Sequence, residues 1–158
     1  MDGTLRGAML LGIERKANYT LIKSGLATFK SYYRGSPFMK IILVALIFGE
    51  LIKHPLTPVY LIAKVYSYKA YLFALSAREC YPAYDRETPV HFKEIFDDFA
   101  AGVVESKAGR AKYNPDTFVI ENEDSCLSGN LTVVSEQDLQ NPHIKFFVER
   151  NPGWRRVQ

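Results

Sequence analysis

Three side chains that could carry acid–base or metal chemistry fall on one face of a predicted helix. His91, Glu94 and Asp98 are spaced three and four residues apart, which places them on neighbouring helical turns. A carboxylate and an imidazole can exchange a proton, and His91 with Glu94 could ligate a metal ion. The charged outer face of a surface helix explains the same residues without chemistry. We therefore treat them as weak catalytic candidates and expect no metal.

The helix that carries these residues has clear sequence signals. Thr88 and Pro89 are typical of a helix start. An apolar stripe follows at the spacing of one helical face, and this face should pack on a core. The stripe consists of Phe92, Ile95, Phe96, Phe99 and Val103.

Other residues that could do chemistry are isolated. Cys80 and Cys126 form no CxxC pair, so buried free thiols are favoured, although one disulfide between them is possible. The acidic run 121–124 lacks the spaced ligands and glycine of a calcium loop. Trp154 beside two arginines is too small a set for a nucleic-acid surface. With no phosphate-binding loop or nucleophile motif in the chain, we expect no cofactor and no nucleic-acid partner, and a non-enzymatic role is favoured.

The most apolar segment of the chain is predicted to be a helix from Phe38 to about Lys53. Between Ile41 and Gly49 it has no polar side chain on any helical face. Lipid, a partner subunit or the protein's own core must cover it. The segment lies between the length of a buried core helix and the roughly 20 apolar residues of a spanning helix.

A second helix is predicted over Val59 to Leu75, after a break at Pro55 and Pro58. Two lysines inside it would cost about 2.5–3.5 kcal/mol each at a bilayer centre, and its tyrosines suit the lipid–water boundary. The two helices would form an apolar hairpin that contacts a membrane or a partner, or a soluble hairpin whose apolar faces meet. The predicted membrane or partner contacts are Phe38, Ile41, Ile42, Leu43, Leu46, Ile47, Phe48, Tyr60, Tyr68 and Tyr71.

Charge is distributed unevenly along the chain. Residues 1–49 contain seven basic and two acidic side chains, whereas residues from 79 onward contain nine basic and fourteen acidic ones. Basic residues beside an apolar segment suit an anionic lipid surface. Within residues 1–36, leucines and isoleucines recur at roughly helical spacing between glycines, so one or two short amphipathic helices are predicted there.

These patterns predict an α+β protein in three parts. Residues 1–36 form a basic amphipathic helical segment, 37–77 the membrane-associated helical hairpin, and 78–158 a small acidic α+β domain. Its short antiparallel sheet should contain strands at 117–120, 131–134 and 144–148, with a capped helical turn opening at Ser135.

The leading functional hypothesis is a small non-enzymatic accessory subunit of a membrane protein complex. Its partners would be membrane lipid and other protein subunits, and its location membrane-associated. One alternative is a monotopic enzyme acting on a lipid-linked substrate, with His91, Glu94 and Asp98 at the membrane face. The other is a soluble oligomeric domain that uses the apolar helix as a core or interface.

Overall fold

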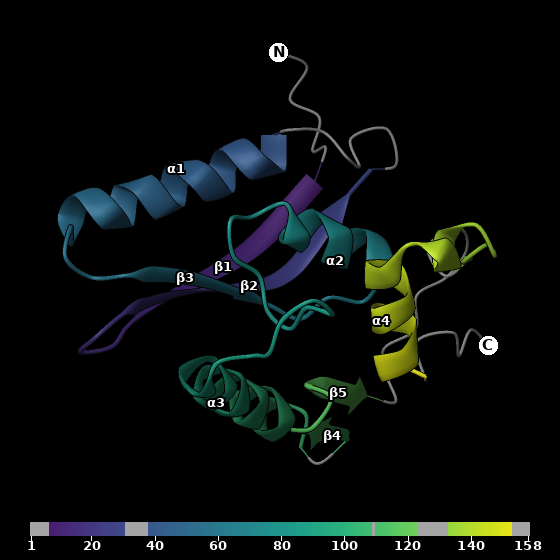
Figure 1. The fold of residues 1–158 in the computed structure, drawn as a ribbon. Coiled ribbons are helices and arrows are strands. Elements are labelled where there is room, and N and C mark those ends of the chain that lie inside the picture. The colour runs from purple at the N-terminus through teal and green to yellow at the C-terminus, as the bar shows by residue number, and fades with distance from the viewer. Residues whose placement is uncertain (1–6, 31–37, 109, 123–132, 153–158) are drawn as a thin grey trace. The chain divides into compact units, whose positions relative to one another are not determined.

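The computed structural model describes residues 7–30, 38–108, 110–122 and 133–152, with side chains at all of these except 26–29, 38 and 122. The chain divides into two compact units, residues 1–64 and 65–158. The described residues form four α-helices and two small sheets (Figure 1), which confirms the α+β class. The assignment of 1–36, 37–77 and 78–158 as separate domains stays a prediction.

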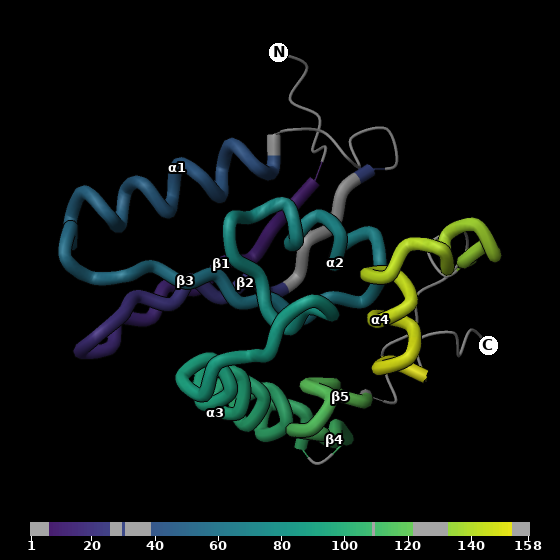
Figure 2. Tube along the Cα trace, in the orientation of Figure 1, coloured from purple at the N-terminus to yellow at the C-terminus, as the bar shows by residue number. Residues whose placement is uncertain are grey.

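The first unit is a three-stranded sheet with one crossover helix. Strands β1 (Gly7–Arg15) and β2 (Thr20–Phe29) form an antiparallel hairpin, and β3 (Val59–Ala63) lies parallel to β2 in the order β1-β2-β3. Two parallel neighbours need a long connection, and helix α1 (Phe38–Lys53) provides it. The Cα trace in Figure 2 shows how the chain runs from α1 into β3.

The predicted helices in residues 1–36 are wrong, because the described part of this segment is the β1–β2 hairpin. Its apolar residues fit a strand as well as a helix. Ile13 faces Ile22 across the ladder, and β1 alternates between more and less exposed positions over most of its length. Gly7, Gly12 and Gly25 would each cost a helix about 1 kcal/mol. The paired strands are therefore more stable than the predicted helices in this segment.

The predicted helix from Phe38 to Lys53 is confirmed. The prediction of one continuous helix over Val59 to Leu75 is wrong. Val59–Ala63 is strand β3, and a shorter helix, α2 (Tyr68–Leu75), begins only after Ser67, whose Oγ accepts a hydrogen bond from the Ala70 N–H at 3.3 Å. A β-branched and aromatic segment beside the open edge of β2 gains a full ladder of backbone hydrogen bonds as a strand. In the described part of the chain, no helix combines the length and apolarity needed to cross a membrane.

The second unit has its core between α2 and α4 (Pro142–Arg150). Tyr68, Tyr71, Ile144 and Phe147 are buried together there. The unit also contains helix α3 (Val90–Ser106), the hairpin of β4 (Ala111–Asn114) and β5 (Val119–Asn122), and the 3-10 turn η3 (Asp138–Gln140).

Helix α3 and the capped turn are confirmed. The Ser135 Oγ accepts from the Asp138 N–H at 3.1 Å, and an Asp138 carboxylate oxygen accepts from the Ser135 N–H at 2.9 Å. These reciprocal bonds hold the turn, with Asp138 in the role that Glu or Gln usually takes.

The predicted sheet of the second unit is partly wrong. Residues 144–148 belong to helix α4, because Asn141 caps its first turn and Pro142 suits the first helical position. Strand β5 overlaps the strand predicted at 117–120, but it pairs with β4, which was not predicted. Residues 133–134 lie in no strand, and 131–132 lie outside the described residues.

Candidate functional site

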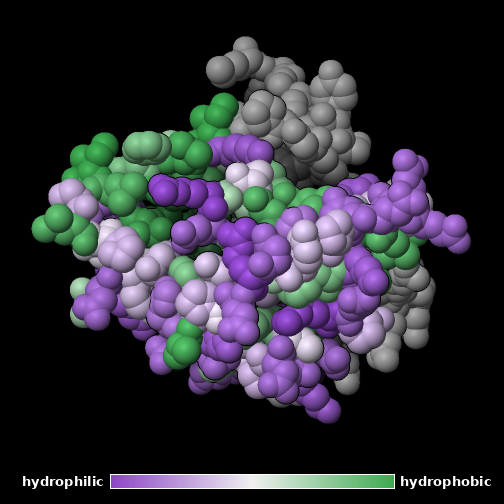
Figure 3. Space-filling view, viewed as in Figure 1, coloured by the Kyte–Doolittle hydropathy of each residue, from purple (hydrophilic) through white to green (hydrophobic). Residues whose placement is uncertain are grey.

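The outer side of α1 is an exposed apolar face. Ile41, Val44, Phe48 and Ile52 recur at one-helical-face spacing, and Ile41, Phe48 and Ile52 are 61%, 60% and 79% exposed. Figure 3 shows hydrophobic residues gathered over this helix. Four large apolar side chains on one exposed stripe are unusual, because scattered single residues are the norm on a protein surface. We call these four residues the α1 outer face.

The opposite side of α1 packs within the first unit. Leu43 is buried, and Ile42, Leu46 and Ile47 are half-buried. The predicted contact residues of α1 are therefore divided between two sides. Ile41 and Phe48 lie on the exposed face, whereas Ile42, Leu43, Leu46 and Ile47 lie in or near the packed side. The side chain of Phe38 lies outside the described residues.

A buried carboxylate with two half-exposed basic partners lies on the inward side of α1. The side chain of Glu50 is 2% exposed, and its carboxylate accepts hydrogen bonds from Arg15 of β1 at 2.9 Å and from Lys53 at 2.9 Å. The Lys53 hydrogen bond, followed by Arg15, lowers the pKa of Glu50 despite the opposing effect of burial. Glu50 is the only acid in α1. Its inward position leaves the outer face without negative charge.

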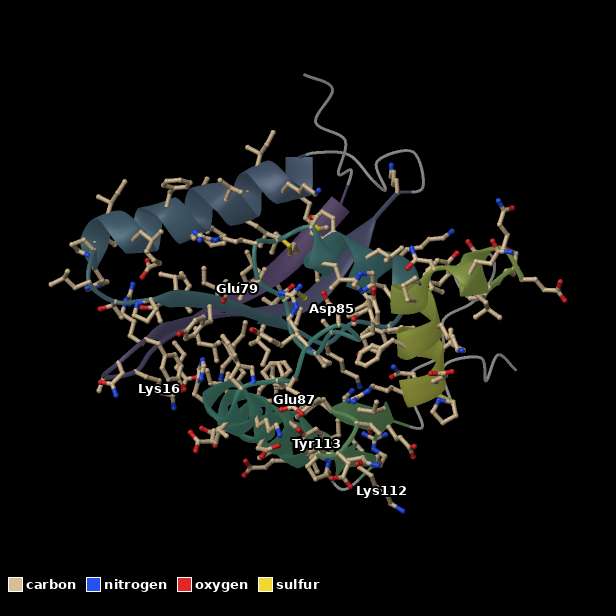
Figure 4. The ribbon with its side chains drawn as sticks, viewed as in Figure 1. Lys16, Glu79, Asp85, Glu87, Lys112 and Tyr113 are labelled. Atoms are coloured by element: carbon tan, nitrogen blue, oxygen red, sulfur yellow. The ribbon has the colours of Figure 1, made fainter. Side chains whose placement is uncertain are left out.

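The first unit is rich in basic residues. Lys40 lies near the start of α1 and Lys53 at its end. Residues 1–64 contain nine basic and three acidic side chains, a net charge of +6, whereas residues 65–158 contain eleven and fourteen, a net charge of −3. In the β1–β2 hairpin, Lys16 (labelled in Figure 4) and Lys23 pair with Glu14 and lower its pKa.

The predicted tyrosine contacts lie elsewhere. Tyr60 on β3 is half-buried, with its ring centroid 5.7 Å from that of Tyr19. Tyr68 and Tyr71 are buried in the core of the second unit. The Tyr71 hydroxyl donates to the Pro82 carbonyl at 3.0 Å, and burial raises its pKa to about 12. Tyr68 and Tyr71 are therefore core residues, not exposed contacts.

The weak catalytic candidates lie on the solvent side of α3. His91, Glu94 and Asp98 are all exposed, and the His91 ring packs against Phe92 with centroids 4.1 Å apart. Among the residues that the structure describes, no group of three His, Cys, Asp or Glu side chains could hold a metal ion.

Sequence reasoning missed one polar contact of the same helix. The Tyr113 hydroxyl of β4 donates to the Asp97 carboxylate at 2.7 Å (Figure 4). Burial, then the hydrogen bond to Asp97, raises the pKa of Tyr113. No local motif marks this pair, because the two residues are sixteen positions apart and β4 was not predicted.

A second missed cluster surrounds His143 at the start of α4. Its ring meets the Tyr84 ring edge-on with centroids 4.6 Å apart, and it also lies near Tyr71. The Nδ1 atom of His143 is buried and has no hydrogen-bond partner within the described part of the chain. Asp85, beside Tyr84, pairs with Arg86 at 2.8 Å (Figure 4). The aromatic contacts with Tyr84 and Tyr71 account for the position of the half-buried His143 ring.

The remaining sequence candidates form no site in the described residues. Cys80 is a half-buried free thiol, and burial raises its pKa. Cys126, Trp154 and residues 123–124 of the acidic run lie outside the described residues. The prediction of buried free thiols stays a prediction, because Cys126 lies outside the described residues.

Comparison with known proteins assigns no family to this chain. Neither a protein-family description, nor a curated protein, nor a solved structure matches this chain. The α1 outer face is therefore interpreted from its own chemistry.

Proposed function

We propose that this protein is a non-enzymatic accessory subunit of a membrane protein complex and that it docks through the α1 outer face. The face lies on the surface of an anionic bilayer, with its apolar side chains at the acyl boundary and the basic residues of the first unit among the headgroups. The acidic second unit contacts other protein subunits.

One observation carries this proposal: α1 exposes four large apolar side chains while its only acid is turned inward and neutralised. Full burial of one such side chain contributes about 1.5–3 kcal/mol. Four side chains that are roughly half to four-fifths exposed can therefore contribute several kcal/mol on insertion. Basic residues near anionic lipid add about 1 kcal/mol each. The two terms together suit reversible binding at an interface.

Of the two alternatives, the lipid-linked enzyme has the weaker support, because its three candidate residues are all exposed on α3. The soluble-oligomer alternative makes a different prediction for the same face. It expects the α1 outer face to be covered by protein, with no affinity for lipid.

Vesicle binding by Phe48→Glu tests the proposal. The full chain should co-sediment with vesicles of phosphatidylcholine and phosphatidylserine, and F48E should bind at least about tenfold more weakly. The substitution removes apolar area and places a carboxylate at the acyl boundary, and about 1.4 kcal/mol corresponds to a factor of ten.

Val90→Glu is the matched control. Val90 is an exposed apolar residue at the start of α3 in the second unit, and V90E adds the same charge. It should bind vesicles like the unmodified chain. Both variants should retain the circular dichroism spectrum and melting temperature. Absence of vesicle binding by the unmodified chain, or equal binding by F48E, would overturn the proposal.

A further inference from the structure

Strand β1 is an unpaired edge of the sheet in the described structure. The order β1-β2-β3 places a strand on only one side of β1. The strand is nine residues long, and residues 7–13 contain neither a charge nor a proline. Leu10 is 68% exposed and Ile13 is also exposed. Natural edge strands usually carry charges, prolines or bulges that block further pairing, and most of β1 has none of these.

The β1–β2 hairpin contains one register shift, and it does not interrupt β1. Met9 pairs with Ala27 and Leu11 with Ser24, so one residue of β1 faces two residues of β2. The bulge therefore belongs to the central strand β2. The other edge strand, β3, has five residues and follows directly after Pro58. Of the two edges, β1 is the better template for another strand.

We propose that β1 pairs antiparallel with β1 of a second copy of this chain, in a register centred on Leu11. In that register Met9 lies opposite Ile13 of the second copy, and Leu10 lies opposite Gly12. The two charged residues, Glu14 and Arg15, lie opposite the uncharged Ala8 and Gly7. No like charges face each other, and apolar residues meet apolar residues, which is the pattern that stabilises cross-strand pairs. The strand is thus complementary to itself, as a two-fold interface requires.

This pairing has a geometric consequence for α1. The two-fold axis that relates antiparallel neighbours in a continuous sheet is perpendicular to that sheet. The dimer would contain one six-stranded sheet, with both copies of α1 on the same face. If the proposed function holds, the two α1 outer faces would meet one membrane together and gain avidity. The dimer itself does not depend on that function.

Analytical ultracentrifugation of the full chain tests the dimer. A concentration series should show a reversible species of twice the 18.0 kDa chain mass, and association should be weak because one strand pair buries less than a standard interface of about 1,200–2,000 Å². In the proposed register the Leu10 side chains of the two copies are diagonal neighbours, roughly 7–8 Å apart. Leu10→Lys replaces this apolar contact with like charges and should raise the dissociation constant at least about tenfold.

Leu61→Lys is the matched control, because Leu61 is an exposed leucine on the opposite edge strand, β3. L61K should dimerise like the unmodified chain. A chain that stays monomeric throughout the series, or a dimer that L10K leaves unchanged, would overturn the proposal. So would a dimer that L61K disrupts as strongly as L10K, because the contact would then lie elsewhere.

A cross-link tests the register without depending on the stability of a charged variant. Leu11→Cys places two thiols directly opposite each other, and mild oxidation should give a covalent dimer that the unmodified chain does not form. Leu61→Cys should give none, and a cross-link through L61C alone would contradict the pairing. F48E separates the two proposals, since it should weaken vesicle binding and leave the dimer intact. Loss of the dimer in F48E would assign the contact to α1.

Discussion

At the scale of single residues, the second unit relies on polar contacts between residues distant in sequence. Asp97 of α3 accepts a hydrogen bond from Tyr113 of β4, and Arg150 of α4 donates to the Asp116 carbonyl at 3.3 Å. Near the same hairpin, Phe118 has a φ of 57°, in the left-handed region that residues other than glycine seldom adopt. Its ring packs against Phe96 with centroids 5.1 Å apart. Side-chain contacts with α3 therefore hold the β4–β5 hairpin on that helix.

Tyr113→Phe should lower the free energy of unfolding by about 0.5–1 kcal/mol, because it removes one hydrogen bond from a partly exposed pair. The pKa of Tyr113 is raised in the folded state, so its neutral phenol stabilises the fold below the ordinary tyrosine pKa of about 10 and this contribution is lost as pH rises further. Urea denaturation at neutral and alkaline pH measures both effects.

The stability difference between the unmodified chain and Y113F should shrink as the pH rises above about 10. Tyr84→Phe serves as the comparison, because Tyr84 is an exposed tyrosine whose hydroxyl makes no hydrogen bond within the described residues. A Y113F variant as stable as the unmodified chain at neutral pH would show that the bond to Asp97 contributes nothing.

At the scale of elements, α1 is oriented by the ion pair that joins it to β1. Arg15 reaches Glu50 through both Nε and an Nη nitrogen, at 3.2 Å and 2.9 Å. A bidentate pair restrains direction as well as distance. The Glu50 carboxylate is buried, but the Arg15 side chain is 52% exposed, so solvent screens part of this attraction. The orientation that exposes the α1 outer face thus depends on a residue of the preceding hairpin.

Glu50→Gln should lower the melting temperature at neutral pH, because Arg15 and Lys53 would lose their charged acceptor. The pKa of Glu50 is lowered in the folded state. Its contribution is therefore fully present above the unfolded pKa, near 4.5, and is lost as the pH falls through the lower folded value. Thermal unfolding followed by circular dichroism across this pH range should show the two proteins converging in acid.

Glu149→Gln is the control for that comparison, since Glu149 is exposed and its nearest basic partner, Lys145, is 3.8 Å away. It should melt like the unmodified chain at every pH. A difference between E50Q and the unmodified chain that widened in acid would contradict the assigned role of Glu50.

At the scale of the whole molecule, charge and apolar exposure coincide in the first unit. That unit has a net charge of +6 and carries the α1 outer face, whereas the second unit has a net charge of −3 and an aromatic core. The proposed membrane contact therefore combines a charge-dependent and a charge-independent term. These terms respond differently to salt.

Vesicle binding should weaken as salt concentration rises when the vesicles contain phosphatidylserine, and reach a residual level set by the apolar contact. Vesicles of phosphatidylcholine alone should bind the chain more weakly and with little salt dependence. Co-sedimentation over a salt series measures both. Equal binding to the two compositions at low salt would show that the basic residues play no part, and complete loss at high salt would show that the apolar face does not insert.

The sequence by itself determined the elements whose signals are local. Helix α1 follows from an uninterrupted apolar segment, and α3 from its stripe of Phe92, Ile95, Phe96, Phe99 and Val103. The turn at Ser135 follows from a capping pattern within four residues. The difference in net charge between the two halves of the chain also follows from the sequence, since it requires only composition. Two residues of the α1 outer face, Ile41 and Phe48, are among the contacts that the sequence predicts.

Only the tertiary structure decided which apolar segments became strands and which sides stayed exposed. Thr20 pairs with Val59, 39 positions away in the sequence. The pairing that makes 59–63 a strand therefore cannot be recognised from a short stretch of sequence. The partner of Glu50, Arg15, is equally remote. Apolar periodicity is ambiguous over a few residues, and backbone pairing with a distant segment resolves it by satisfying hydrogen bonds that a local pattern cannot supply.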